Sequence, residues 1–365
     1  VDRRGNGWNW TYTAAGLVAP EASPLGRTTS YEYDAEGRQT ATIDPAGNRS
    51  TTTYDATGNT TRSTDADGYK TTQTYDSLGR LITTTAPGGA TQTTTYNAAG
   101  QRASTDNHID APISYEYNSA GREIIRKQGG RVIAQFSYDP AGRILATTDA
   151  NGAVTSNTYD AAGHTLTTTN ALGGVTTNAY DAAGRLTQTT QPWGGVTKKT
   201  YDAAGRLASV SDPSSASTSY SYDADGRLTK TQYADGTTTR TRYDAAGNTI
   251  ASIDANGVTA TSEFDEANQL VAQVDGAGRR TTFGYNKAGY QTSATGPDGA
   301  TESATYTAAG QTLTTTSGTG VVTRYGYDDA GDPTSTTDPL GNVSSTTFDK
   351  LGRVLTERDP NQQSD

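Results

Sequence analysis

The chain has 365 residues and a formal net charge of −10, with 29 Lys and Arg against 39 Asp and Glu. No stretch approaches about 18 consecutive apolar residues, the acidic balance gives no basic footprint for nucleic acid, and the absence of Cys excludes disulfides and thiolate chemistry. Leu, Ile, Val and Phe make only 43 residues, near 12%, whereas Thr and 22 Tyr favour strands, so a disordered chain and a β-rich fold with a thin core both fit.

Aromatic residues recur along the chain at a constant interval of 21 residues. A disordered chain has no physical reason to keep such a register, whereas stacked structural units do, because one inserted residue would turn strand side chains to the wrong face. The spacing therefore predicts 17 tandem repeats, marked by Tyr12, Tyr33, Tyr54, Tyr75, Tyr96, Tyr117, Tyr138, Tyr159, Tyr180, Tyr201, Tyr222, Tyr243, Phe264, Tyr285, Tyr306, Tyr327 and Phe348.

Each repeat is predicted to hold two strands and two turns. In the repeat 174–194, a Thr- and Val-rich strand over 175–180 ends at Tyr180, and Asp181 opens a turn whose Gly184 supplies positive φ. A second strand over 185–190 leads to a second turn over 191–195. The whole chain then reads as a series of β-hairpins.

Glycine marks both predicted turns. The position of Gly184 is Gly in 16 of 17 repeats, and the exception, Asn268, also tolerates the left-handed conformation. The position of Gly194 in the second turn is Gly in 13 of 16 complete repeats, with Asp110, Arg131 and Ser215 as exceptions. We select as structural turn glycines Gly37, Gly58, Gly79, Gly121, Gly142, Gly184, Gly205 and Gly226.

The faces of the strands are less clearly patterned. A second aromatic two residues before the first, as at Tyr31 and Tyr220, shares its face and predicts aromatic rows that stack across neighbouring strands. Adjacent aliphatic residues after the turn, as at Leu81 and Ile82, break strict alternation. Two explanations stay open: both faces are partly covered, or a bulge follows the turn.

Only repeats that deviate from the pattern can host a unique site. The segments 101–131 and 213–219 deviate, and Trp193 occupies a turn, where packing on a neighbouring turn is favoured over a sugar-stacking platform. His108 and His164 have no partner at metal-ligand spacing, and the repeated Asp residues are explained as turn caps. We expect no catalytic, cofactor or metal site.

Seventeen hairpins give about 34 strands, and at roughly 4.8 Å per strand one sheet would extend on the order of 160 Å. Open sheets rarely exceed about ten strands without curling. The predicted fold is all-β: one array over residues 1–365, truncated at both ends, whose long antiparallel sheet coils as a spiral ribbon or hollow shell. The absence of Met, with Val as residue 1, suggests a processed chain or a fragment.

The motifs YDAAGRLT (180–187), YDAAGRLA (201–208) and YDADGRLT (222–229) resemble those of the YD-repeat or Rhs-repeat family, and the resemblance covers essentially the whole chain. It implies a secreted or cell-surface protein of bacterial type. In Rhs and toxin-complex proteins such repeats form a β-shell around a C-terminal toxin; teneurin-like shells support adhesion, and YD repeats have been associated with carbohydrate binding.

These observations favour a non-enzymatic scaffold whose partners are flanking domains of the same polypeptide, with a toxin as possible cargo. The alternatives are an adhesion or carbohydrate-binding module that recognises glycans or a cell-surface partner, and a surface protein that associates end to end into filaments through its exposed terminal strands. An enzyme acting on polysaccharide is the least favoured interpretation.

Overall fold

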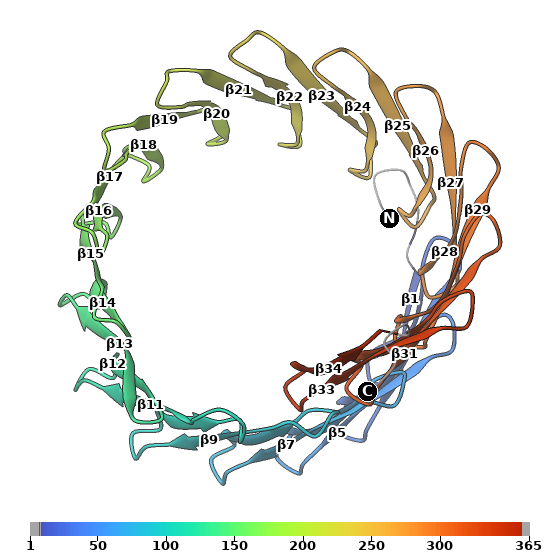
Figure 1. Cartoon of the computed structure of the whole chain (residues 1–365), viewed down its shortest axis with the longest axis horizontal. Coiled ribbons are helices and arrows are strands. Elements are labelled where there is room, and N and C mark those ends of the chain that lie inside the picture. The colour runs from blue at the N-terminus through green and yellow to red at the C-terminus, as the bar shows by residue number, and fades with distance from the viewer. Residues whose placement is uncertain (1–6, 8, 360–365) are drawn as a thin grey trace. The chain divides into compact units, whose positions relative to one another are not determined.

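The structure, a computed structural model, describes residue 7 and residues 9–359. Within these residues all regular secondary structure is β, in 34 short strands (Figure 1). The part of the chain that the structure describes has no helix with the length and hydropathy of a membrane span. The all-β prediction is therefore confirmed.

The strands alternate along the chain between one that ends at a repeat aromatic and one that follows the next turn. Their bounds are β1 (Asn9–Tyr12), β2 (Val18–Ala22), β3 (Thr28–Tyr33), β4 (Gln39–Ile43), β5 (Arg49–Tyr54), β6 (Thr60–Thr64), β7 (Lys70–Tyr75), β8 (Leu81–Thr85), β9 (Thr91–Tyr96), β10 (Arg102–Asp106), β11 (Ile113–Tyr117), β12 (Glu123–Gln128), β13 (Arg131–Tyr138), β14 (Ile144–Asp149), β15 (Val154–Tyr159), β16 (Thr165–Thr169), β17 (Val175–Tyr180), β18 (Leu186–Thr190), β19 (Val196–Tyr201), β20 (Leu207–Ser211), β21 (Ser217–Tyr222), β22 (Leu228–Gln232), β23 (Thr238–Tyr243), β24 (Thr249–Ile253), β25 (Thr259–Phe264), β26 (Leu270–Val274), β27 (Arg280–Tyr285), β28 (Gln291–Thr295), β29 (Thr301–Tyr306), β30 (Thr312–Thr316), β31 (Val322–Tyr327), β32 (Pro333–Thr337), β33 (Val343–Phe348) and β34 (Val354–Arg358).

These strands belong to one 34-stranded sheet built from hairpins. Strands that follow each other in the chain pair antiparallel, as β17 does with β18 and β18 with β19. This confirms the predicted series of hairpins. Such local pairing closes only short loops, so each unit buries its flanks against the units before and after it.

Two turns alternate along the sheet. We call the five residues after each repeat aromatic the first turn, and the five residues that end just before the next aromatic-bearing strand the second turn. Asp34 to Arg38 form a first turn, in which the amide of Gly37 donates to the Asp34 carbonyl at 3.0 Å. Asp44 to Asn48 form a second turn with the same bonds, including Gly47 to Asp44 at 3.0 Å. The two edges of the ribbon are therefore made of turns, not of free strand edges.

A β-bulge follows the first turn in most of the hairpins and accounts for the adjacent aliphatic residues. Tyr75 pairs with Leu81 but Thr74 pairs with Thr83, so that Ile82 is the extra residue. Because a bulge sets two residues opposite one, it shifts the alternation of side chains between the faces. The same register shift occurs at Tyr33, Tyr54, Tyr117, Tyr138, Tyr159, Tyr180, Tyr201, Tyr222, Phe264, Tyr285, Tyr306, Tyr327 and Phe348.

The buried core is very small. Among the described residues the buried hydrophobic side chains are Ala41, Ala251 and Ala272, which occupy the same position in their respective repeats. No large side chain of the described part is fully buried. The stability of the chain must therefore come from the strand ladder and from half-buried contacts between neighbouring units, since a single layer has no interior to fill.

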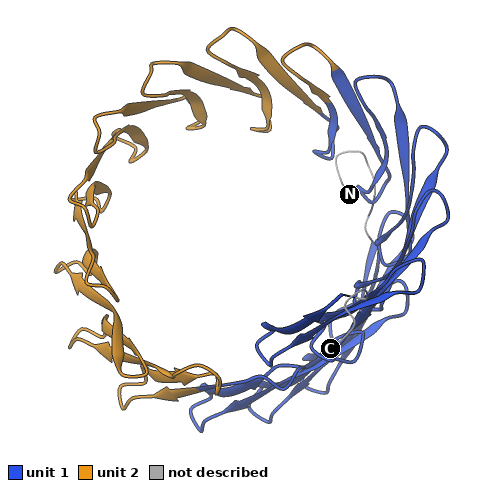
Figure 2. Ribbon diagram, viewed as in Figure 1, with its two compact units in different colours: residues 1–93, 243–251, 259–365 blue, residues 94–242, 252–258 orange. Residues whose placement is uncertain are grey.

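The chain divides into two compact units (Figure 2). Unit 1 comprises residues 1–93, 243–251 and 259–365, and it brings early hairpins next to late ones. Unit 2 comprises residues 94–242 and 252–258, and its hairpins follow one another in a single curved layer (Figure 2).

Candidate functional site

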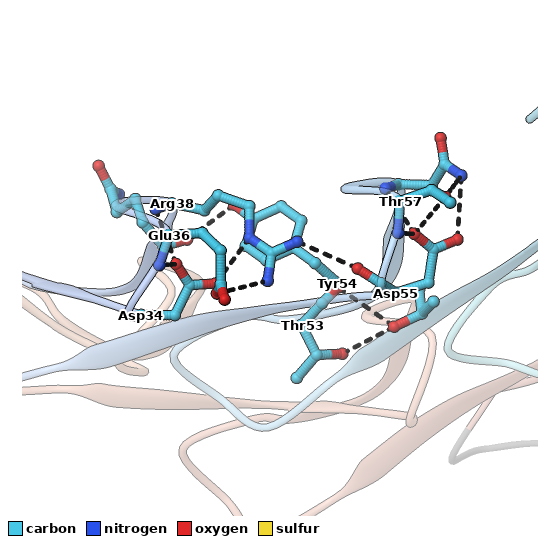
Figure 3. Close-up of polar contacts among 10 residues, drawn as sticks. Asp34, Glu36, Arg38, Thr53, Tyr54, Asp55 and Thr57 are labelled. Atoms are coloured by element: carbon cyan, nitrogen blue, oxygen red, sulfur yellow. Dashed lines mark hydrogen bonds and ion pairs between the residues drawn. The ribbon is translucent and has the colours of Figure 1, made fainter.

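The recurring polar cluster of the molecule joins the first turn of one hairpin to the aromatic of the next (Figure 3). Asp34 Oδ1 accepts the amide of Arg38 at 2.9 Å, and Asp34 Oδ2 accepts Arg38 Nε at 2.7 Å. The same guanidinium donates through Nη1 to the Asp55 carbonyl at 3.0 Å and lies 4.9 Å from the centroid of the Tyr54 ring. We call this arrangement of Asp, Arg and the following aromatic the inter-hairpin junction.

The aromatic hydroxyl adds a second bond across the same junction. Tyr54 Oη donates to the Gln39 carbonyl at 2.7 Å, and Gln39 is the residue that pairs with Tyr33 where the bulge begins. The hydroxyl therefore supplies a donor at a point where the strand ladder is interrupted. A half-buried ring with a bonded hydroxyl and a cation on its face ties each hairpin to the previous one.

This junction recurs in both compact units. Equivalent hydroxyl-to-carbonyl bonds, each to the preceding hairpin, come from Tyr33, Tyr54, Tyr75, Tyr117, Tyr138, Tyr159, Tyr180, Tyr201, Tyr222, Tyr285, Tyr306 and Tyr327. An arginine covers the ring of Tyr54, Tyr138, Tyr159, Tyr201 and Tyr222. These repeat aromatics thus make equivalent contacts, each with the hairpin that precedes it in the chain.

Other side chains can take the place of the arginine. His164 accepts or donates at Nδ1 with Asp160 Oδ2 at 2.8 Å and stacks on Tyr180 with ring centroids 4.7 Å apart. Tyr290 lies 5.3 Å from Tyr306, centroid to centroid. A flat side chain that reaches the next ring can therefore replace arginine at this position, so arginine is frequent there without being obligatory.

The predicted aromatic rows need a correction. The sequence predicted rings that stack directly across neighbouring strands, but the structure places Arg185 over the Tyr201 ring, 4.7 Å from its centroid. The reason is that the bulge and turn bring the last residue of one first turn onto the next repeat aromatic. The role of this arginine was missed, although its constant separation from the following Tyr was a usable signal.

Hydrogen bonds within the first turn favour the ionised form of several turn carboxylates. The side-chain amide of Asn59 and the hydroxyl of Thr57 donate to Asp55 and lower its pKa from 3.8 to about 2. Hydrogen bonds from Arg185 lower the pKa of Asp181, and hydrogen bonds from Arg353 lower that of Asp349. Asp55, Asp181 and Asp349 are therefore charged at neutral pH, and each is hydrogen-bonded within its first turn.

We expect acid to destabilise the array. A carboxyl whose pKa is lower in the folded chain adds stability above its unfolded pKa of about 4, and that stability is lost as pH falls through the folded value of about 2 at Asp55. The thermal midpoint should fall progressively between about pH 4 and pH 2. Asp55→Asn keeps an acceptor but removes one titrating group, so its midpoint should fall less steeply; a steeper fall in the variant would contradict this interpretation.

The selected turn glycines lie in the left-handed region of the backbone. Positive φ values occur at Gly37, Gly58, Gly79, Gly121, Gly142, Gly184, Gly205 and Gly226. At Asn268 and Ser215, which stand where other repeats have Gly, φ is 65° and 71°. The turn geometry is thus the same even where the residue type differs.

The deviating segment 101–131 uses different turns. His108 has a φ of 60°, and the Asn107 side-chain oxygen accepts the amide of Asp110 at 2.8 Å. The turn between β12 and β13 is a tight two-residue one in which Gly129 and Gly130 have φ of 56° and 85°. Two glycines at these positions suit a primed hairpin turn. The missing Gly signals of this segment are therefore compensated one or two positions earlier.

The other singled-out residues do not converge on one site. His108 Nδ1 lies 3.4 Å from Asp106 Oδ2. No group of three or more His, Cys, Asp or Glu side chains able to hold a metal occurs in residues 7 and 9–359. Trp193 is 71% exposed, and its ring lies against Gly195 of its own turn. The preferred prediction that Trp193 packs on a neighbouring turn was therefore wrong, because the adjacent Gly195 leaves room for the ring within the turn.

The pattern of the RHS Repeat family matches residues 12–49, 54–91, 75–112, 117–154, 159–196, 201–238, 224–259, 243–278, 264–301, 306–343 and 327–364, which together cover most of the chain. The chain belongs to the RHS repeat family. The resemblance of the YD-x-x-G-R motifs is thereby confirmed, and a match such as 54–91 begins at a repeat aromatic and extends over most of two hairpins. None of the curated protein sequences matches this chain.

Several solved structures of Tc toxin complexes contain a chain with the same fold as this RHS repeat chain. The TcdB2-TccC3-Cdc42 crystal structure shares 18% identity with a TM-score of 0.70, and covers 97% of this chain and 23% of that one. The Photorhabdus luminescens Tc holotoxin pore gives the same values, and TcdB2-TccC3-TEV gives a TM-score of 0.73 at 15% identity, with 97% of this chain and 25% of that one covered. The chain thus spans about a quarter of the length of these relatives, and the likeness shows the fold.

Proposed function

We propose that this RHS repeat chain is a non-enzymatic structural scaffold, a wall segment of a larger secreted or cell-surface protein of bacterial type. The observation that carries the proposal is the inter-hairpin junction. It uses the Asp, Arg and Tyr of successive hairpins, as at Asp181, Arg185 and Tyr201, to hold neighbouring units together. Those charged groups are committed to structure, so their chemistry serves cohesion of the wall.

The enclosing or display of a C-terminal toxin or effector is the finer part of the proposal. It is supported by the Tc toxin complexes that share the fold, and by a sheet with almost no interior of its own, which is the construction that a thin wall requires. The partners are then the segments that adjoin the repeats in the natural polypeptide. On this proposal residues 1–365 act as one array.

Limited proteolysis of the natural polypeptide tests this function. If the repeats enclose their adjoining segment, that segment should survive a protease concentration that degrades it when it is expressed without the repeats. The matched control is the same polypeptide after acid or urea has unfolded the repeats, in which protection should disappear. Equal digestion rates with and without the folded repeats would rule out enclosure.

An adhesive function that recognises glycans is the second candidate, and it is favoured by the exposed Trp193. An indole that is 71% exposed at a turn offers an apolar face on which a sugar ring can stack. If this is the function, the chain should bind on a glycan array and Trp193→Ala should remove the signal. Leu172→Ala, at the equivalent position one repeat earlier, is the control and should leave binding unchanged. An array without signal, or a signal that survives Trp193→Ala, counts against this candidate.

A further inference from the structure

Unit 1 already contains a contact between hairpins that lie far apart in the sequence. A Cβ atom on Gly88 would lie 2.8 Å from the Ala330 Cβ atom, so the second turn of one hairpin touches the first turn of the other. Arg27 Nη1 donates to Gln269 Oε1 at 2.6 Å between two further turns of the same kinds. The turn edge formed by the early hairpins of unit 1 is thus covered by the opposite turn edge of the late hairpins.

The opposite ends of the same two repeats carry exposed leucines. Gly88 is the middle residue of a second turn, and the first turn of that repeat presents Leu78 at its middle, which is 75% exposed. Ala330 is the middle residue of a first turn, and the second turn of its repeat presents Leu340 at its middle, which is 88% exposed. The two leucines therefore occupy the same two repeat positions that touch each other inside the chain.

A second pair of equivalent positions extends this apolar surface. Tyr69, the last residue of its second turn, lies beside Gly331 in the contact inside unit 1. Its counterpart in the late hairpins is Val321, also the last residue of a second turn, which is 44% exposed. We call Val321 and Leu340 the upper patch, and Leu78 the lower patch.

We propose that copies of this chain stack head to tail, with the upper patch of one copy seated on the lower patch of the next. The occupant is a second copy because the complementary surface is present on the chain itself and the equivalent turn-on-turn contact is already made inside unit 1. The internal contact is made by Gly88 and Ala330, and the residues at the equivalent positions of the free turn edges are Leu340 and Leu78. The intermolecular contact is therefore apolar.

The two patches differ, which fixes the symmetry of the assembly. An interface between two different surfaces of one chain is heterologous, and it propagates into open chains unless the rotation closes a ring. This route uses the turn edges of unit 1 and is independent of pairing by the terminal strands. It also goes beyond a scaffold function, since it gives that scaffold a means of assembling from many copies.

Cysteine cross-linking gives a direct test because the chain contains no cysteine. Leu78→Cys and Leu340→Cys are made as separate variants, mixed, and oxidised mildly. The mixture should give a disulfide-linked dimer on a non-reducing gel, at a yield at least about tenfold above that of either variant alone. A mixture of Leu78→Cys with Leu172→Cys, a still more exposed position of unit 2, is the control. Equal yields in all mixtures would overturn the proposal.

Sedimentation velocity of charged variants gives the second test. The unmodified chain should form larger species as its concentration rises, whereas Leu78→Asp and Leu340→Asp should each remain monomeric. A mixture of the two should stop at a 1:1 dimer, because each variant retains only one intact patch. An unmodified chain that stays monomeric, or dimers of Leu78→Asp alone, would overturn the proposal.

The charged variants need a folding control, and the exposed positions of the substituted residues lead us to expect that the variants fold normally. Leu78 and Leu340 lie at exposed turn tips, so their thermal midpoints and circular dichroism should match those of the unmodified chain. Leu172→Asp, which is also at an exposed turn tip, should leave self-association unchanged. Loss of association in Leu172→Asp as well would show unspecific contact between apolar tips and would contradict the proposed pairing.

Discussion

Tyr201→Ala should destabilise the chain by about 2–3 kcal/mol, the largest effect that we expect from one side chain outside the turns. The substitution removes a half-buried ring, the contact with the Arg185 guanidinium 4.7 Å away, and the 2.8 Å bond from the hydroxyl to the Leu186 carbonyl. Because units in a repeat array contact only their neighbours, the loss should be concentrated in β18 to β20. Urea unfolding measures the total, and hydrogen exchange measures its location.

Two matched variants separate the contributions of the ring and its hydroxyl. Tyr201→Phe removes only the bond to the Leu186 carbonyl and should cost about 1 kcal/mol, which agrees with the presence of Phe264 and Phe348 at equivalent positions. Tyr233→Ala, at an exposed tyrosine in a second turn, should change stability by less than about 0.5 kcal/mol. A Tyr201→Ala variant no less stable than Tyr233→Ala would show that the repeat aromatics do not hold the array.

Gly184→Ala is the second substitution with a large expected effect. Gly184 has a φ of +77°, and a Cβ atom there would stand 2.6 Å from His164 Nε2, so alanine adds backbone strain and displaces the imidazole from its junction. The strain costs about 1–2 kcal/mol, and the displaced imidazole adds about 1 kcal/mol. The free energy of unfolding from urea titration measures the sum.

Gly163→Ala is the matched control for the contribution of the imidazole. Gly163 has a φ of +96° with nothing within 4 Å of a Cβ atom, so only backbone strain is added. Gly184→Ala should therefore be more destabilising than Gly163→Ala, and the difference should vanish when both are made in a His164→Ala background. If the two alanine variants were equal in the original background, the imidazole would not be held firmly in the junction.

The local structure of this protein follows closely from its sequence. The regular interval between aromatics predicted hairpins, the Gly found in most turns predicted positive φ, and the motif around Tyr180 to Leu186 predicted the family. Local pairing makes this possible, because each strand meets the strand next to it in the chain. A residue's neighbours are then largely set by its position within one repeat.

Contacts beyond one repeat were predicted less well. Stacked aromatic rows were expected, but the bulge after the first turn brings Arg185 onto Tyr201. The adjacent aliphatic residues Leu81 and Ile82 were compatible either with two partly covered faces or with a bulge, and the register of β7 and β8 shows the bulge. Trp193 was misplaced because only the backbone shows that Gly195 leaves room for its ring. In each case the deciding quantity is the local path of the backbone, and neither composition nor the spacing of residues specifies that path.

The sequence by itself thus determined the repeating hairpin, its turns and the family, since these depend on interactions inside a unit and with the next one. The tertiary structure alone decided which turns of residues 1–93 meet which turns of residues 259–365, as at Gly88 and Ala330. The physical reason is that identical repeats offer many equivalent partners. The small change of direction from one hairpin to the next, summed over many units, selects among them.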